Sequence, residues 1–296
     1  MKPIRRFYLF TLFLFASGLL VYAGNTAEPH RLMSCNIRVA LEEDEAKGFG
    51  WNNRKECCIQ VIKSYNPDII CLQEVIKIQY LDLKKEFEDY TVFGFEGPDM
   101  DAFPEGYQGI AKNIILFSKN RYEYVSAGCY WLSETPLIAG SKSWNTARAR
   151  HCNWVRLKDK SSGKEFRVLD LHLDHVSQLA KEKQTTLVMT ESAQYQSDFP
   201  QLLAGDFNAD MQNEVIRIVK KDGWIDTFST IHGETEPGRT THGFQGVNVK
   251  PGKTGRIDFI FSKGQVKSVS SEIVKDEING KYPSDHFFIY TDVIIK

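Results

Sequence analysis

Residues 67–75 read Pro-Asp-Ile-Ile-Cys-Leu-Gln-Glu-Val, an apolar run that ends in an amide and a carboxylate. The Asn66-Pro67 pair is a turn signal, and the isoleucines that follow it predict a short buried strand. Side chains such as Gln73 and Glu74 are costly to bury unless they bond to one another or to a ligand. This stretch therefore predicts the interior of a sheet together with a polar edge.

Four other places in the chain combine an apolar strand with polar side chains at its end. We expect all five sets to meet in one cleft, at the edge of the sheet where the strands end. The polar residues concerned are Asn36 in or after the first strand, His172, Asp174 and His175 after 166–171, Asp206 and Asn208 after 202–205, and Ser284, Asp285 and His286 before the last strand.

Each of these sets also has an ordinary structural explanation. Glu74 is placed to cap the helix that follows it. Asp206 and Asn208 are residue types that form turns by bonding to their own backbone. His172 is compatible with a core histidine, and Asp285 with a turn before a strand. The presence of all of them in one chain favours a functional site.

Strand and helix patterns alternate along the rest of the chain. Strands are predicted over 31–39, 68–73, 90–95, 113–118, 122–131, 153–158, 166–173, 201–204, 256–261, 266–274 and 287–295, and helices over 54–65, 79–87, 177–195 and 213–220. The sequence has no internal repeat and no linker, so one mixed α/β domain over 27–296 is the simplest partition. The segments 96–108 and 234–253, rich in Gly, Pro and polar residues, are expected to be surface loops that rim a site.

The first 23 residues have the features of a secretory signal peptide. Three basic residues within 1–6 precede the apolar run 7–23, which ends in Val-Tyr-Ala before Gly24. A transmembrane anchor is the alternative, but this run is at or below the roughly 17 to 25 residues that span a bilayer. We therefore expect an exported protein, periplasmic or secreted, whose formal net charge changes from −1 to −4 when residues 1–23 are removed.

The composition is close to that of an average globular protein, with 42% hydrophobic residues, 25% charged residues, 21 Gly and 10 Pro. It excludes a collagen-like, low-complexity or largely disordered chain. A net charge near zero gives no basic stripe of the kind that binds polyanions. The six cysteines lack the spacing of a zinc site, and we expect Cys35 and Cys71 to be free thiols in buried strands.

The polar residues favour metal-assisted hydrolysis of a phosphoester. Mg²⁺ prefers carboxylate and amide oxygens together with water. In-line attack on phosphorus also needs a base for the water and hydrogen-bond donors for the phosphate oxygens. The candidates are Glu74, Asp285 and Asn36 for the metal, His286 as the base, and Asn208 and His172 as donors. The sequence contains no Gly-x-Ser-x-Gly, Walker or Gly-x-Gly-x-x-Gly motif, so acyl transfer and nucleotide-driven chemistry lack support.

Six motifs, in order, resemble those of the endonuclease/exonuclease/phosphatase superfamily. That superfamily includes deoxyribonucleases, abasic-site endonucleases, inositol polyphosphate 5-phosphatases and neutral sphingomyelinases. The motifs are Met33-Ser-Cys-Asn-Ile-Arg38, Pro67-Asp-Ile-Ile-Cys-Leu-Gln-Glu-Val75, Leu171-His-Leu-Asp-His175, Gly205-Asp-Phe-Asn208, Arg256-Ile-Asp-Phe-Ile-Phe261 and Tyr282-Pro-Ser-Asp-His286. Segments 131–136, 141–144 and 150–154 are further similar to a bacterial, often exported branch of the superfamily.

The resemblance implies a four-layer α/β/β/α sandwich, with two mixed β-sheets flanked by helices and a cleft at one edge. It also implies a hydrolase that acts on phosphoester bonds with Mg²⁺ or Mn²⁺ as cofactor. Carried over by position, the metal ligands are Glu74, Asn36 and Asp285. The resemblance also implies that Asp258 orients His286, which acts on the attacking water. It further implies that Asp206 and Asn208 position the nucleophile and the phosphate, and that His172 forms a hydrogen bond to the phosphate.

The chain departs from the relatives at two positions. Many relatives read Asn-Thr-His where this chain has Asp170-Leu-His172, and deoxyribonuclease-type relatives carry a Glu near 113–117 that supports the histidine. That Glu is missing from this sequence, and Asp174 is a candidate replacement. Further candidates for contact with the substrate are Arg150, Asp174 and His175, with Arg148 beside them.

The motifs leave the substrate open. A phosphodiester or a phosphomonoester of a small molecule, a lipid headgroup or a nucleic acid is compatible with them, as are one or two metal ions. A secreted nuclease is one alternative, although an acidic chain weakens the attraction for polyanions. A non-catalytic member that binds a phosphorylated ligand is another. We expect a monomer with no obligate protein partner.

Overall fold

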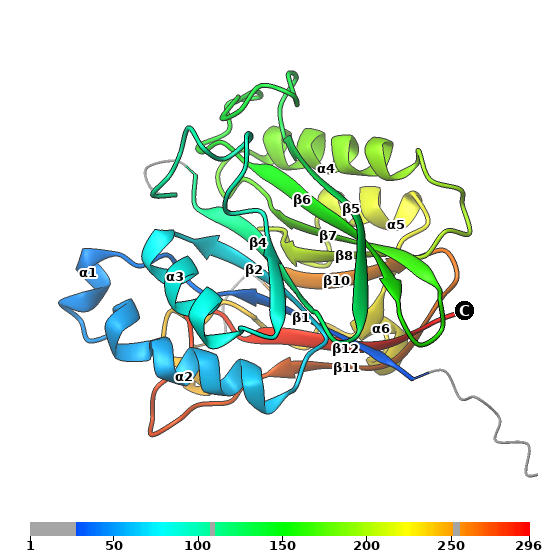
Figure 1. The fold of residues 1–296 in the computed structure, drawn as a ribbon. Coiled ribbons are helices and arrows are strands. Elements are labelled where there is room, and N and C mark those ends of the chain that lie inside the picture. The colour runs from blue at the N-terminus through cyan, green and yellow to red at the C-terminus, as the bar shows by residue number, and fades with distance from the viewer. Residues whose placement is uncertain (1–27, 107–109, 251–254) are drawn as a thin grey trace, which may run out of the picture.

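The structure is a computed structural model that describes residues 28–106, 110–250 and 255–296. Two six-stranded sheets lie face to face (Figure 1). The first sheet has the order β11-β12-β1-β2-β4-β3, and the second β5-β6-β7-β8-β10-β9. Both sheets are mixed, because β1 pairs with β2 and β7 with β8 in parallel while the other pairs are antiparallel.

The strands of the first sheet are β1 (His30–Asn36), β2 (Ile69–Val75), β3 (Tyr90–Phe93), β4 (Lys112–Ser118), β11 (Val266–Val274) and β12 (Phe288–Ile295). Those of the second are β5 (Tyr122–Trp131), β6 (His151–Asp159), β7 (Glu165–His172), β8 (Gln201–Asp206), β9 (Ile225–Asp226) and β10 (Asp258–Lys263). The helices are α1 (Glu42–Glu45), α2 (Trp51–Ser64), α3 (Lys77–Glu86), α4 (Gln178–Ser192), α5 (Glu214–Lys221) and α6 (Thr227–His232), with a 3₁₀ turn at Gly246–Asn248.

Three apolar clusters hold four layers together. Between the sheets, residues such as Leu32 and Ile69 of the first sheet pack against Phe166 and Leu202 of the second. Helices α2 and α3 cover the outer face of the first sheet, and α4 and α5 cover the outer face of the second (Figure 1). The predicted sandwich of two mixed sheets flanked by helices is therefore confirmed.

The six cysteines are free, and Cys35 and Cys71 are fully buried in β1 and β2, as predicted. The predicted signal peptide lies outside the described residues. Among the residues that are described, no helix has the length and apolar character to cross a membrane.

Several strand boundaries differ from the prediction at the edge where the site lies. Strands β2 and β8, predicted to end at residues 73 and 204, extend to Val75 and Asp206, so Glu74 and Asp206 lie within their strands. The first strand ends at Asn36 rather than at residue 39, because Arg38 has a left-handed φ of 55° and turns the chain. Strand β10 begins at Asp258 rather than at residue 256. Helices α1 and α6 and strand β9 were not predicted, since four, six and two residues are too short for a periodic pattern.

Candidate active site

The strand registers bring the polar residues to one edge of the sandwich. Asn36 is opposite Gln73 where the parallel strands β1 and β2 end, and His172 is opposite Asp206 where β7 and β8 end. The antiparallel strand β10 begins at the same level, with Asp258 opposite Asp206. The resulting cleft has a volume of about 1080 Å³. The site candidates that line it are Glu74, Arg150, His172, His175, Asp206, Asn208, Asp285 and His286.

Asn36 connects the two sheets through its side-chain amide. Its Nδ2 donates to Glu74 Oε1 and to Asp206 Oδ2, both at 3.0 Å, while its Oδ1 accepts from the backbone N–H of Arg38. Glu74 has a left-handed φ of 66°, and its Oε2 accepts from the backbone N–H of Val39 at 2.8 Å. Burial raises the pKa of Glu74, but the hydrogen bonds from Val39 and Asn36 outweigh burial and lower the pKa overall. Glu74 is therefore a carboxylate held in one orientation.

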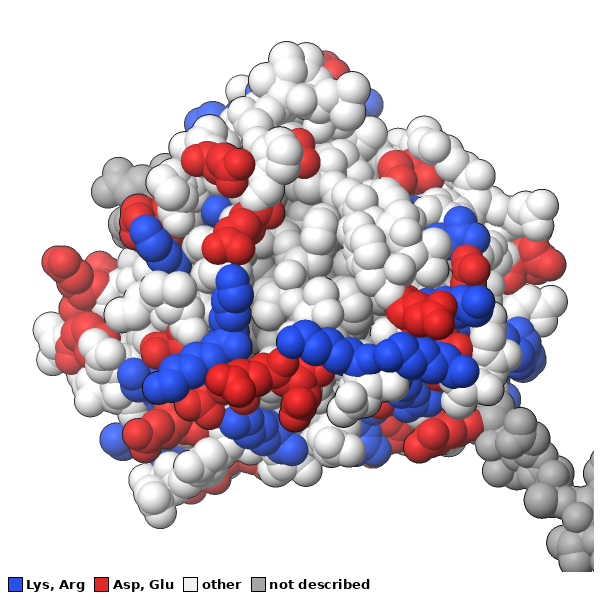
Figure 2. All heavy atoms as spheres, in the orientation of Figure 1, with Lys and Arg blue, Asp and Glu red and all other residues white. Residues whose placement is uncertain are grey.

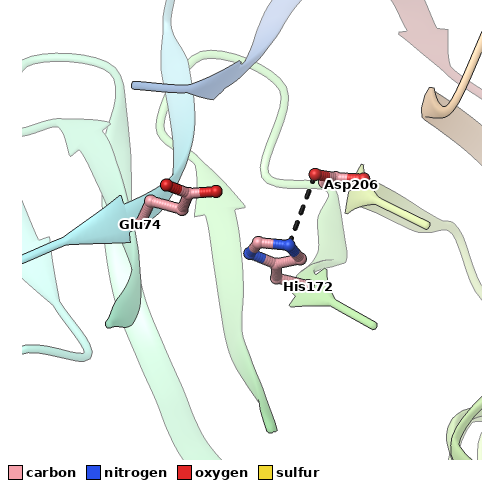
Figure 3. Close-up of side chains that lie close together, drawn as sticks. All are labelled: Glu74, His172 and Asp206. Atoms are coloured by element: carbon pink, nitrogen blue, oxygen red, sulfur yellow. Dashed lines mark ion pairs between the residues drawn. The ribbon is translucent and has the colours of Figure 1, made fainter. Parts of the chain in front are cut away.

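Asp206, Asn208 and His172 form the second group. Figure 3 shows Glu74, His172 and Asp206 converging from three strands, with His172 Nε2 at 3.3 Å from Asp206 Oδ2. The Asn208 side-chain amide lies 3.0 Å from His172 Nε2, and its backbone N–H donates to Asp206 Oδ1. Burial and the charge of Asp258 raise the pKa of Asp206 to about 7. Burial and the charge of Arg150 hold the pKa of His172 well below 6.5, so this imidazole is neutral.

His286 is oriented by Asp258. Its Nδ1 lies 3.0 Å from Asp258 Oδ2, and its Nε2 lies 4.0 Å from Asp206 Oδ2. Burial lowers the pKa of His286, but the charge and hydrogen bond of Asp258 outweigh burial and raise the pKa well above 6.5. The Thr240 hydroxyl accepts from the backbone N–H groups of Ile257 and Asp258 and so fixes the start of β10.

Asp285 completes the acidic part of the cleft. Its carboxylate lies 3.7 Å from the Arg38 guanidinium, and burial raises its pKa. The loop that carries it is held by the buried Arg54 of α2, which donates to the backbone carbonyls of Pro283, Ile37, Arg38 and Phe49. Arg54 thus ties the turn after β1 to the turn before β12.

The arrangement fits a hard divalent cation. Donor atoms of Glu74, His172 and Asp206 all lie within 4.8 Å of one another, as do those of Asp206, Asp258 and His286. Buried carboxylates this close repel one another unless a cation or proton compensates them, which the raised pKa of Asp206 reflects. Carboxylate and amide oxygens are the ligands that Mg²⁺ prefers. Glu74 and Asp206, with Asn36 and Asp285 beside them, are the residues that would hold it.

Asp174 does not take the place expected from the sequence. It is fully buried, and its carboxylate accepts from the backbone N–H groups of Ala147, Val176 and Ser177. These bonds order the turn before α4, and within the part of the chain that the structure describes Asp174 makes no hydrogen bond to a site histidine. His175 is exposed and Arg150 is buried, and both line the cleft.

Several positioning residues were missed by the sequence analysis. Arg54 is one, and Lys181 of α4 is another, since its ammonium donates to the backbone carbonyl of Asn208 at 2.9 Å. Arg54 precedes the buried Cys57 and Cys58 by three and four residues and so lies on the buried face of α2. That spacing was a usable signal, whereas nothing in the sequence singles out Lys181 or Thr240.

The chain is thus a two-sheet sandwich with carboxylates, amides and imidazoles gathered at its strand-end edge. The chain belongs to the Endonuclease/Exonuclease/phosphatase family, whose model matches residues 33–286. Other members of this family are phosphoesterases and nucleases.

Solved structures of similar proteins cover nearly the same extent. An endonuclease/exonuclease/phosphatase from Bacteroides vulgatus is 26% identical with a TM-score of 0.78, over 90% of this chain and 99% of that one. A mannosyl-6-phosphatase from Bacteroides thetaiotaomicron is 26% identical with a TM-score of 0.77, also over 90% and 99%. Human nocturnin is 25% identical over 305 residues, which are 90% of this chain and 66% of nocturnin.

Proposed function

We propose that this protein is a metal-dependent phosphoesterase that hydrolyses its substrate by attack of water on phosphorus. The proposal rests on three groups of side chains that meet at one cleft. They are the carboxylates of Glu74 and Asp206, the His286–Asp258 pair and the neutral His172. Structural caps or turns would not need to face one another across two sheets.

The residues divide the reaction between them. Asp258 holds Nδ1 of His286 so that Nε2 faces Asp206, and the attacking water lies between these two groups. The Asp206 carboxylate, 4.0 Å from Nε2 of His286, is placed to accept the proton that the water loses. The Asn208 amide donates to Nε2 of neutral His172 at 3.0 Å and to the backbone carbonyl of Leu173, so it orients an imidazole whose remaining N–H, on Nδ1, is the donor for the phosphate. A divalent cation bound near Glu74 would neutralise charge on the phosphate and the leaving oxygen.

A small phosphoester is favoured over a nucleic acid. The similarity to a mannosyl-6-phosphatase over nearly the whole chain supports a compact substrate. Lys and Arg are interspersed with Asp and Glu over the face shown in Figure 2, and the whole chain has a net charge of −1. Strand binding depends on neutralising several adjacent phosphates, which this charge distribution does not favour.

We also propose that residues 1–23 direct export and that 27–296 form the catalytic domain.

Metal removal and replacement of Glu74 test the metal-dependent mechanism. Activity on p-nitrophenyl phosphate and bis(p-nitrophenyl) phosphate should vanish after treatment with EDTA and return with Mg²⁺ or Mn²⁺. Glu74→Gln should reduce kcat by about 100-fold or more. Glu123→Gln, which removes a largely exposed carboxylate on β5, is the matched control and should retain activity. Full activity after complete chelation would exclude the metal.

A substrate panel distinguishes the remaining alternatives. Plasmid DNA, RNA, sphingomyelin, inositol phosphates and sugar phosphates should be compared with metal present. Hydrolysis of a sugar phosphate without cleavage of nucleic acid is the expected result. Efficient cleavage of DNA or RNA would establish the nuclease, and binding without hydrolysis of any substrate would establish a non-catalytic phospho-ligand-binding protein.

A further inference from the structure

Arg150 places an unusual positive charge in the wall of the cleft. It directly precedes β6, and its backbone carbonyl accepts from the N–H of Leu132 at 2.7 Å, which fixes its main chain. Its side chain lines the cleft, although the residue is only 7% exposed. A charge as well buried as this normally has a carboxylate partner or, like Arg54, a set of carbonyl acceptors, because the loss of hydration must be compensated.

Arg150 has no such partner among residues 28–106, 110–250 and 255–296. Its one side-chain contact there is Nη2 to Nδ1 of His175 at 3.4 Å, and its Nε makes no hydrogen bond. Two other buried arginines differ from it: Arg167 pairs with Glu191 at 2.8 Å, and Arg256 pairs with Asp226. The unpaired guanidinium therefore points to an anionic group that the described residues do not supply.

The nearby carboxylates do not replace that group. Glu74 and Asp206 influence Arg150 through space, but neither lies within 4.0 Å of it, and both are the residues that would compensate a bound cation. When a bound cation compensates these two carboxylates, the positive charge of Arg150 remains available to pair with an anionic substrate. Arginine offers a planar fork of N–H donors that matches two oxygens of one phosphate.

The charge of the substrate then decides how well it fits. A phosphate monoester carries close to two negative charges at neutral pH and presents three terminal oxygens. A diester carries one charge, and an ester group takes the place of one terminal oxygen. Only the monoester has both an additional charge and an additional oxygen to offer to the Arg150 fork.

We propose that Arg150 is the residue that makes this enzyme selective for phosphate monoesters over diesters, an inference that rests on the proposed phosphoesterase function. In the reaction, the water oxygen bonds to phosphorus and the ester P–O bond breaks. The proton lost by the water is returned to the departing alkoxide, so the products are an alcohol and inorganic phosphate. Arg150 holds terminal oxygens of the phosphate throughout and exchanges no proton.

Variants of Arg150 test the proposal with two substrates that share one chromophore. In Arg150→Met, kcat/KM for p-nitrophenyl phosphate should fall on the order of 100-fold, while that for bis(p-nitrophenyl) phosphate should fall less than about five-fold. Arg150→Lys, which keeps the charge without the fork, should lie between Met and the wild type. Arg217→Met removes an arginine that is 65% exposed on α5 and should leave both values unchanged.

Binding without turnover gives an independent result. Titration calorimetry at pH 8 should show inorganic phosphate binding to the wild type and Arg217→Met more tightly than diethyl phosphate, and Arg150→Met should lose that difference. Equal losses for both anions, or an unchanged monoester-to-diester ratio in folded Arg150 variants, would overturn the proposal. If neither the nitrophenyl esters nor any member of the substrate panel is hydrolysed, the phosphoesterase function fails, and the calorimetric comparison still decides whether Arg150 selects a dianion.

Discussion

His286 Nδ1 lies 3.0 Å from Asp258 Oδ2, and the two residues belong to different sheets. Asp258 begins β10 of the second sheet, and His286 precedes β12 of the first. A carboxylate in this position stabilises the protonated imidazole and directs its Nε2 toward Asp206. The pair is therefore both a catalytic device and a bond between the layers.

Asp258→Asn keeps the shape of this contact but removes its charge. We expect kcat to fall by about 10²- to 10⁴-fold with a smaller change in KM, because the imidazole loses the carboxylate that orients it and compensates its charge. The circular dichroism spectrum should remain that of the wild type. A kcat within two-fold of the wild type would show that Asp258 does not act through His286.

Arg54 has a role in stability that can be separated from charge. Arg54→Leu leaves four backbone carbonyls without their donor, and we expect the free energy of unfolding to fall by about 2 to 4 kcal/mol. Lys63→Leu, which removes a half-exposed charge from the same helix, should change it by less than about 0.5 kcal/mol. Urea denaturation measures both, and equal effects would contradict the role given to Arg54.

Gly205 precedes Asp206 at a place where only glycine fits. Its φ is 149°, and a Cβ there would overlap the backbone carbonyl oxygen of Leu171 on the neighbouring strand. Gly205→Ala should therefore displace β8, lower stability by at least about 2 kcal/mol and abolish most activity. Gly163→Ala is the control, since its φ is 72° with open space around it. It should cost about 1 to 2 kcal/mol and leave kcat unchanged, so equal activity losses would refute the steric explanation.

His30 makes stability depend on pH. Burial and the charge of Arg121 lower its pKa from 6.5 to about 4, and its Nδ1 lies 2.8 Å from the Tyr122 hydroxyl. The unfolded chain binds more protons than the folded chain between these two values. Above pH 6.5, His30 therefore does not lower the free energy of unfolding. As the pH drops toward 4, His30 lowers it by up to about 3 kcal/mol.

His30→Phe should flatten this dependence, because it removes the titrating group and keeps an aromatic ring. The measurement is the free energy of unfolding in urea at intervals from pH 7 to pH 4.5 for both proteins. Parallel curves would show that His30 does not contribute to the acid sensitivity, which other buried histidines such as His151 would then have to supply.

The fold was predictable because its strands are strongly apolar and end in polar residues. The apolar runs at 69–72 and 202–205 identify β2 and β8, one inner strand in each sheet. The polar residues at the ends of these strands identify the edge that the two sheets share. The left-handed turn at Arg38 was not predictable, because it depends on contacts with Arg54 and Asp285 that are distant in sequence. The four-residue α1 is too short for a periodic pattern.

Side-chain roles were harder to predict than positions. Asp174 has the residue type and location of a substrate contact, yet the turn before α4 uses both of its oxygens. Sequence spacing shows that a residue lies near the cleft, but it does not show which way a side chain points or which backbone N–H groups compete for it. Arg150 illustrates the converse, because the role proposed for it depends on its having no carboxylate partner among the residues that the structure describes.

The site is assembled from two halves, with Asn36 and Glu74 on one sheet and His172, Asp206 and Asp258 on the other. A chain in which each sheet has formed but the two sheets have not yet docked contains every catalytic residue. It has no assembled active site and is therefore inactive. During refolding, the return of hydrolysis would therefore lag behind the return of the far-ultraviolet dichroism signal. The recovery of enzyme activity would report the rate at which the sheets dock, whereas the dichroism signal reports the rate at which secondary structure forms.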